Sequence, residues 1–147
     1  WGSAMSEDTV KLLKECDAGC KMATDSIAQV EKYAEKEALK KLLDQYQKKH
    51  EKLKEEITEQ LQKFQKEEQE PDKLASAFAW ITTEMKLLMK DNSHQIAKIM
   101  MDGCNMGIQS VSEYLNQYPQ ASQEAKSLAK KLVETEEMFM KELKKFL

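Results

Sequence analysis

The chain has 147 residues and a net charge of −3, and it is 33% charged and 41% hydrophobic. Its basic residues are all lysine, so it lacks the guanidinium fork that commonly recognises phosphates and base edges, and we expect no nucleic-acid partner. Charge-free runs such as 74–83 are far shorter than the roughly 20 apolar residues that span a bilayer, so we expect no membrane insertion.

Composition favours an all-helical fold, because the abundant residues (Ala, Glu, Lys, Leu and Gln) lose little side-chain freedom in a helix. Three cysteines are an odd number and too few for a disulfide scaffold, so we expect reduced thiols and a cytoplasmic location. Residues 1–4 are interpreted as the remnant of an expression tag, and residues 5–147 as a single domain. Possible partners are a second copy of the chain or another protein.

The first helix is predicted from about Ser6, a suitable N-cap, to a break near Glu35. Its apolar residues recur in steps of three and four, which predicts one narrow stripe facing other helices. The stripe consists of Leu13, Cys16, Cys20, Ala23, Ile27, Val30 and Ala34. Both cysteines of this helix are therefore expected to point inward.

The second helix is predicted to end near residue 68, before Pro71, and a shorter crossover helix to follow over 72–90. Capping-type residues at 91–93 predict an interruption before the third helix, which runs from about 94 to the loop at Pro119. The fourth helix is predicted from Ser122 onward. On the second helix the expected inward positions are Leu39, Leu43, Tyr46, His50, Leu53, Ile57 and Phe64. On the third helix they are Ile96, Met100, Gly103, Gly107, Ser110 and Tyr114. On the fourth helix they are Ala125, Leu128, Leu132, Glu136, Phe139 and Leu143.

An internal repeat determines the expected architecture. Residues 14–27 read KECDAGCKMATDSI, and residues 98–111 read KIMMDGCNMGIQSV, so that Gly19 and Cys20 match Gly103 and Cys104 at an offset of 84. At the same offset Glu35 corresponds to Pro119, which lies in a loop, so the first helix is expected to end near Glu35. Two hairpins (6–68 and 94–147) joined by the crossover predict an all-α, up-down four-helix bundle with pseudo-twofold symmetry.

The runs LLKECDAGC at 12–20 and MMDGC at 100–104, together with the segment around Trp80, resemble the small bacterial ferritin-like bundles of unknown function. The resemblance covers nearly the whole chain and implies membership of the ferritin–rubrerythrin superfamily. Di-iron members supply one Glu from each of two helices and a Glu-x-x-His from each of the other two. The matching pairs here are Gln47 and His50 on the second helix and Glu136 and Phe139, or Glu137 and Met140, on the fourth.

On the first and third helices the inward positions carry sulfur: Cys16 and Cys20, then Met100 and Cys104. We therefore expect no working di-iron centre. Cys16 and Cys20, about 6 Å apart on one helix face, are close enough to chelate one ion. The resemblance would also bring Met22 and Met106 near them, and such soft ligands select Cu(I), or Zn where thiolates gather.

The favoured interpretation is a degenerate ferritin-like bundle without a cofactor, in which sulfur side chains fill the former metal cavity and the protein is structural or mediates interactions. The first alternative is a soft-metal protein that binds Cu(I) or Zn through Cys16, Cys20, Cys104, His50, Glu136 and Met100. A thiol-redox protein and a residual non-haem iron protein are further alternatives. Glu136 is expected either to pair with His50 or to reach solvent. Close helix contacts are expected to compensate for Gly19 and Gly103.

Overall fold

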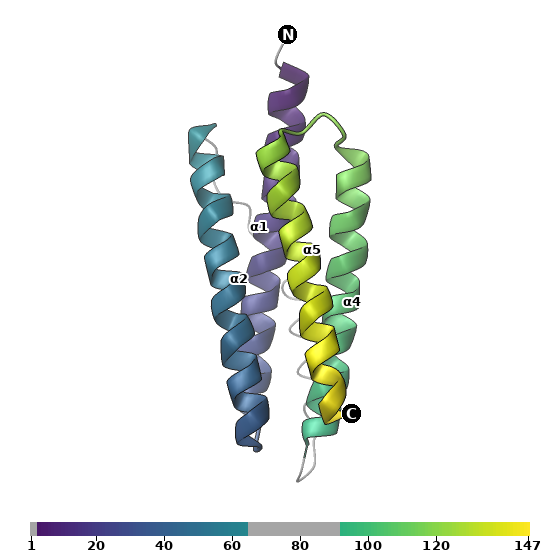
Figure 1. Cartoon of the computed structure of the whole chain (residues 1–147). Coiled ribbons are helices and arrows are strands. Elements are labelled where there is room, and N and C mark those ends of the chain that lie inside the picture. Colours follow the sequence, from purple (N-terminus) through teal and green to yellow (C-terminus); the bar gives the residue numbers. More distant parts are fainter. Residues whose placement is uncertain (1–2, 65–91) are drawn as a thin grey trace.

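A computed structural model of the chain describes residues 3–64 and 92–147 and shows a four-helix bundle (Figure 1). The elements are α1 (Ser3–Glu31), α2 (Glu37–Lys63), α4 (Ser93–Gln117), α5 (Gln123–Leu143) and the short 3-10 helix η1 (Lys144–Phe146). The described residues form no strand, and the predicted all-α class is confirmed. None of the described helices is both long and apolar enough to cross a membrane.

The helices form two antiparallel hairpins, α1 with α2 and α4 with α5 (Figure 1). Helix α2 ends at the end of the bundle where the N-terminus lies, whereas α4 begins at the opposite end, so α2 and α4 run in the same direction (Figure 1). Helix α5 packs against α2 and α1 as well as its hairpin partner, and α1 packs against α4. The crossover helix predicted over 72–90, with Trp80, lies outside the described residues.

The predicted turns agree with the structure, but two predicted helix ends do not. Helix α2 ends at Lys63, with Phe64 as its C-cap, before the predicted end near residue 68. Residues 32–36 are non-helical, which confirms the break near Glu35. Ser122 is the N-cap of α5, and its hydroxyl accepts a hydrogen bond from the Ala125 N–H at 3.1 Å. The predicted start at Ser6 is wrong, because α1 begins at Ser3 and includes residues interpreted as a tag. No glycine or proline interrupts the helix between Ser3 and Ser6, so a capping-type side chain alone does not define its start.

Two apolar clusters fill the bundle, one toward each end. The cluster at the end that holds the α1–α2 turn is built around the stacked rings of Tyr46 and Phe139, whose centroids lie 4.4 Å apart. The other cluster lies beneath the α4–α5 turn. The buried members of the cluster at the α1–α2 turn are Ile27, Val30, Ala34, Leu39, Leu42, Leu43, Tyr46, Ile96, Ala97, Ile99, Met100, Cys104, Phe139 and Leu143. The buried members of the cluster beneath the α4–α5 turn are Leu12, Leu13, Cys16, Cys20, Leu53, Ile57, Leu61, Val111, Ala121, Ala125, Ala129 and Leu132.

The predicted stripe of α4 is wrong in its second half. Ser110 is exposed and Gly103 is half-buried, whereas Cys104 and Val111 point into the core. Burial of Cys104 and Val111 removes more apolar surface from water than burial of glycine or serine would, so these side chains decide which face of the helix turns inward. The interior face of α4 therefore follows Ile96, Met100, Cys104 and Val111.

The burial pattern follows the internal repeat. At the offset of 84, buried Leu12, Leu13, Cys16 and Cys20 correspond to buried Ile96, Ala97, Met100 and Cys104. The second helices correspond at an offset of 86, from Glu37 to Gln123, because α4 runs two residues further than α1 before its turn. At that offset Tyr46, His50, Leu53 and Ile57 match Leu132, Glu136, Phe139 and Leu143, all of them buried. His50 and Glu136 are thus equivalent positions of the two hairpins.

Equivalent residues of the two hairpins also hold the opposite turns. Asp8 Oδ2 accepts a hydrogen bond from the Gln120 N–H at 3.0 Å, and Thr9 Oγ1 accepts one from the Ser122 N–H at 2.7 Å. Asn92, which corresponds to Asp8, donates from Nδ2 to the Tyr33 carbonyl oxygen in the α1–α2 turn at 2.6 Å. A residue near the N-terminal end of the first helix of each hairpin thus binds the turn of the other hairpin, and these contacts fix the axial position of one hairpin relative to the other.

We expect Thr9→Val to lower the free energy of unfolding by about 1–3 kcal/mol, because the partly buried Ser122 N–H would lose its acceptor without a change in side-chain shape. Chemical denaturation measures the loss. Asp8→Ala is the control, since its hydrogen bond to Gln120 is exposed and should contribute less. A Thr9→Val variant as stable as the wild type would contradict the anchoring role of this contact.

Candidate functional site

Three side chains, one each from α1, α2 and α4, lie around a single carboxylate of α5 where the two apolar clusters adjoin. Glu136 of α5 contacts His50 of α2 and accepts a hydrogen bond from the Cys104 thiol of α4. Cys20 of α1 lies close enough for the Glu136 charge to act on it. Their exposed fractions are 0% for Cys20 and His50, 1% for Cys104 and 6% for Glu136. We call these four residues the polar belt.

His50 has an oxygen acceptor at each ring nitrogen. Nδ1 lies 2.6 Å from the Tyr46 carbonyl oxygen, which can only accept, so Nδ1 carries a hydrogen. Nε2 faces Oε1 of Glu136, and a contact between these two atoms requires one proton between them. The prediction that left Glu136 either paired with His50 or in solvent is thereby resolved in favour of the pair.

The environment of His50 has opposing effects on its pKa. Burial disfavours the imidazolium and lowers the pKa, but the hydrogen bond to Glu136, the charge of that carboxylate and the Tyr46 carbonyl outweigh it. The pKa of His50 is therefore raised above its ordinary value. The Phe139 ring packs against the imidazole in an edge-to-face arrangement, with 6.4 Å between ring centroids, and helps to hold its orientation.

Gly107 lies beside the Glu136 carboxylate. A Cβ at Gly107 would lie 3.5 Å from Oε2, which is an ordinary van der Waals contact. The close contact predicted at Gly103 is wrong: among the described residues no atom lies within 4 Å of a Cβ built there. At Gly19 the contact is an ordinary one, 3.7 Å from the Leu132 side chain. Among the described residues, a Cβ would therefore fit at all three of these glycines without a close contact.

All three thiols are free, buried and held in the protonated form. Burial, then the charges of Glu15 and Asp17, raises the pKa of Cys16 to about 12. Burial is also the main cause of the raised pKa of Cys20 and Cys104, and the Glu136 carboxylate adds to both. The nearby Lys54 charge acts in the opposite direction on Cys20. Because the thiolate is the reactive form, these thiols react slowly in the folded protein.

Two of the six predicted metal ligands lie outside the belt. Cys16 and Met100 are buried as predicted, but they are equivalent positions one helical turn from Cys20 and Cys104, and each packs in the same apolar cluster as that cysteine. The expected approach of Met106 is wrong, since its side chain is 58% exposed on the outer face of α4. The structure thus brings Cys20, Cys104, His50 and Glu136 together and leaves Cys16 and Met100 as core residues.

Sequence reasoning missed a buried ion pair on α1. Lys21 Nζ lies 3.3 Å from Asp17 Oδ2, and the two residues are 8% and 0% exposed. An acidic residue four positions before a basic one does suggest a helical ion pair. The sequence did not indicate that this pair is buried, because both residues lie off the predicted apolar stripe of the first helix.

The donor set at the belt does not fit a di-iron centre, which needs several bridging carboxylates, whereas the belt supplies Glu136 alone. Glu15, the acid nearest to Cys16 along α1, instead accepts a hydrogen bond from Tyr114; burial and this bond raise the pKa of Tyr114 to about 12. Within residues 3–64 and 92–147, no three His, Cys, Asp or Glu side chains are arranged to hold a metal ion as they stand.

Comparisons with protein-family models, with curated proteins and with solved structures gave no match. The chemistry of the belt is therefore interpreted from its own geometry.

We expect the free energy of unfolding to fall as the pH rises from about 6.5 through the raised pKa of His50. Over this range the folded protein retains a proton that the unfolded chain has lost, so the stabilisation is complete below 6.5 and disappears above the folded pKa. The slope should reach up to about 1.4 kcal/mol per pH unit for one proton.

Urea denaturation between about pH 6 and pH 8 measures this slope below the range in which the thiols titrate. His50→Gln should abolish it. His94→Gln, at an exposed histidine of α4, is the matched control and should retain it. An unchanged slope in His50→Gln would show that another group binds the proton.

Proposed function

We propose that this chain is a ferritin-like bundle that works without a catalytic centre, as a structural or interaction protein. One observation carries the proposal: the belt is enclosed. The six predicted site residues are between 0% and 6% exposed, and the His50 and Glu136 side chains are occupied by partners inside the protein. A substrate would have to displace packed helices to reach them.

The ferritin-like part of the proposal rests on topology and symmetry. The two antiparallel hairpins are related by the repeat, and α2 and α4 run in the same direction (Figure 1). Each long helix contributes one residue to a polar layer where the two apolar clusters adjoin, and ferritin-like bundles also draw their metal ligands from all four helices, although two of those helices supply a Glu-x-x-His pair. Here that layer carries two thiols, one imidazole and one carboxylate.

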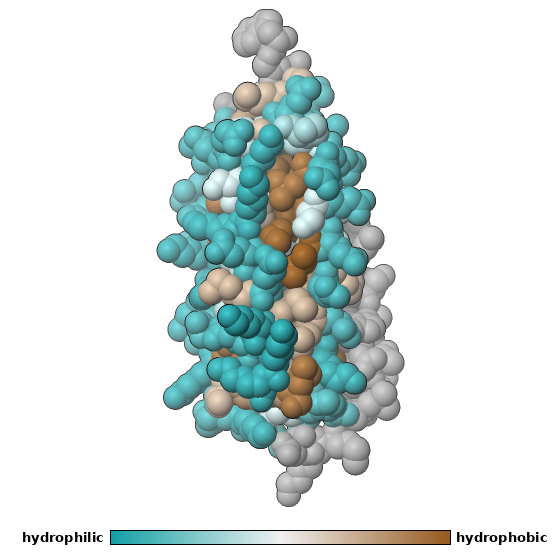
Figure 2. All heavy atoms as spheres, turned by 45° about the vertical axis from the view of Figure 1, so that its right-hand side comes forward, coloured by the Kyte–Doolittle hydropathy of each residue, from teal (hydrophilic) through white to brown (hydrophobic). Residues whose placement is uncertain are grey.

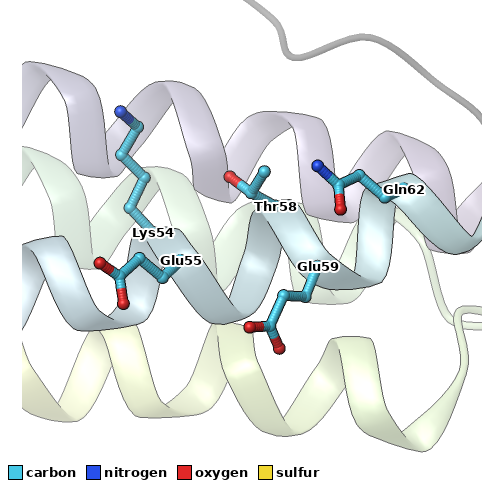
Figure 3. A pocket seen from close by; sticks show the side chains of 5 residues that line it. All are labelled: Lys54, Glu55, Thr58, Glu59 and Gln62. Carbon is cyan, nitrogen blue, oxygen red and sulfur yellow. The ribbon is translucent and has the colours of Figure 1, made fainter.

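Two surface hollows among the described residues lie away from the belt. One is lined by Lys54, Glu55, Thr58, Glu59 and Gln62, whose side chains project from α2 (Figure 3). Another lies where α2 meets the C-terminal end of the bundle, lined by Ala38, Lys41, Leu42, Gln45, Glu142, Lys145 and Phe146. Neither contains a belt residue, and both are lined largely by long polar side chains that water solvates well.

The proposed role therefore belongs to the outer surface. Figure 2 shows polar side chains covering most of one face, with apolar atoms in a furrow along the bundle axis. We also propose a reducing, cytoplasmic setting, because the three cysteines are free thiols. We propose that this surface binds another protein or a second copy of the chain.

Thiol labelling tests the enclosure. At pH 8 a thiol with the pKa of Cys16, about 12, is ionised in roughly one molecule in 10⁴, and burial also blocks the reagent. We expect all three cysteines of the native protein to react much more slowly than in denaturant, where three equivalents should react at once. Rapid reaction of any thiol in the folded protein would favour the thiol-redox alternative.

An iron assay tests the absence of ferroxidase activity. Fe(II) added in air should be oxidised no faster than in buffer, because the belt offers one carboxylate where a di-iron centre needs several. Glu136→Gln should leave the rate unchanged. A stoichiometric two-iron absorption band that Glu136→Gln abolishes would refute the proposal.

A further inference from the structure

Helix α1 is enclosed on all sides over most of its length. No residue from Leu12 to Ile27 is exposed, whereas α2, α4 and α5 each expose at least one residue in every four. A surface helix normally buries one side and leaves the opposite side to water, as those three helices do. The outer side of α1 is therefore covered by a further element.

Three residues mark this covered side. Ala18 lies roughly opposite Cys16 and Cys20 on the helix, at about 100° per residue, yet it is only 7% exposed. Lys21 is 8% exposed, and its Nζ lies 3.3 Å from Oδ2 of the fully buried Asp17. The charges of this pair offset one another, so an element can cover the side without burying net charge. We call Asp17, Ala18 and Lys21 the outer face of α1.

The described helices do not supply the cover. Cys16 and Cys20 share their apolar cluster with residues of α2, α4 and α5, so these three helices lie on the inner side of α1. The exposures are those of one chain alone, so the cover belongs to the chain itself. Residues 1–2 reach about 7 Å at most, whereas Asp17 lies about 20 Å along the helix from Ser3. Residues 65–91 are left as the source.

The position and sequence of residues 65–91 suit this task. They join the end of α2 to the start of α4 at the opposite end of the bundle, a distance of about 40 Å for a helix of 27 residues (Figure 1). Their apolar residues recur in steps of three and four: Leu74, Phe78, Ile81, Met85 and Leu88. In the predicted helix this series is about 21 Å long, and the enclosed stretch of α1 is about 23 Å long.

We propose that the outer face of α1 is the docking surface for the chain's own residues 65–91, with the series from Leu74 to Leu88 packed against it. Ala18 is small and permits a close approach, while the Asp17–Lys21 pair carries no net charge into the contact. The docked segment withdraws this face from other molecules and leaves them the outer faces of α2, α4 and α5. The inference does not rest on the proposed function.

Lysine acylation tests the cover on the wild type. We expect Lys21 to react about tenfold or more slowly than Lys11, an exposed lysine of the same helix, because the reagent reaches Lys21 only when the covering segment moves away. The ratio of the two rates should not change on dilution, since the cover is part of the same chain. Peptide mass spectrometry measures both rates.

Paired substitutions identify the covering segment. Phe78→Glu together with Ile81→Glu puts charge into the apolar series and should remove the protection of Lys21. Ser76→Glu together with Thr83→Glu adds the same charge on the other side of the predicted helix and should retain it. Circular dichroism and slow labelling of the native thiols show that the bundle itself is still folded.

A second variant alters the contact from the α1 side. Ala18→Glu should also expose Lys21 to the reagent, whereas Ala28→Glu, at an exposed position of the same helix, should not. Equal reactivity of Lys21 and Lys11 in the wild type would overturn the proposal. Protection of Lys21 that persists in either disrupting variant would overturn it too. Protection that is lost on dilution would assign the cover to a second copy of the chain instead.

Discussion

The contact between His50 and Glu136 is the interaction on which the arrangement of the bundle depends. The apolar clusters on either side supply most of the stabilisation, but burial of apolar surface is non-directional and tolerates sliding of helices. A hydrogen-bonded pair in the interior is directional. If α2 and α5 shifted by one turn, both groups would be buried without partners, at a cost of several kcal/mol. The pair therefore selects one axial register among those that the clusters would accept.

The same contact explains why two equivalent positions carry different residues. His50 and Glu136 occupy corresponding places in the two hairpins, whereas Cys20 and Cys104 are identical. Two histidines or two glutamates meeting at this depth would place like charges together and force one to lose its charge. An acid and a base at the two positions share one proton instead. The pseudo-twofold symmetry is thus kept in the backbone and broken in the side chains where electrostatics requires it.

Enclosure of the belt bears directly on catalysis. A catalytic metal or thiol needs an open position, because a substrate must reach it. The belt residues are buried, which supports the proposed role without a catalytic centre. On this proposal the interior of the bundle holds the helices together, and the outer surface is the part that meets other molecules.

The sequence by itself determined the helices, the turn near Glu35 and the inward direction of Cys16, Cys20 and Cys104. These features depend on local periodicity and on a repeat that can be read directly. Only the tertiary structure decided that Glu136 pairs with His50, that Cys16 and Met100 lie outside the belt, and that Asp17 and Lys21 are buried. Contacts between helices depend on axial register. That register is set jointly by the His50–Glu136 pair, by the turn contacts of Asp8, Thr9 and Asn92 and by the two further residues of α4, and no local period encodes it.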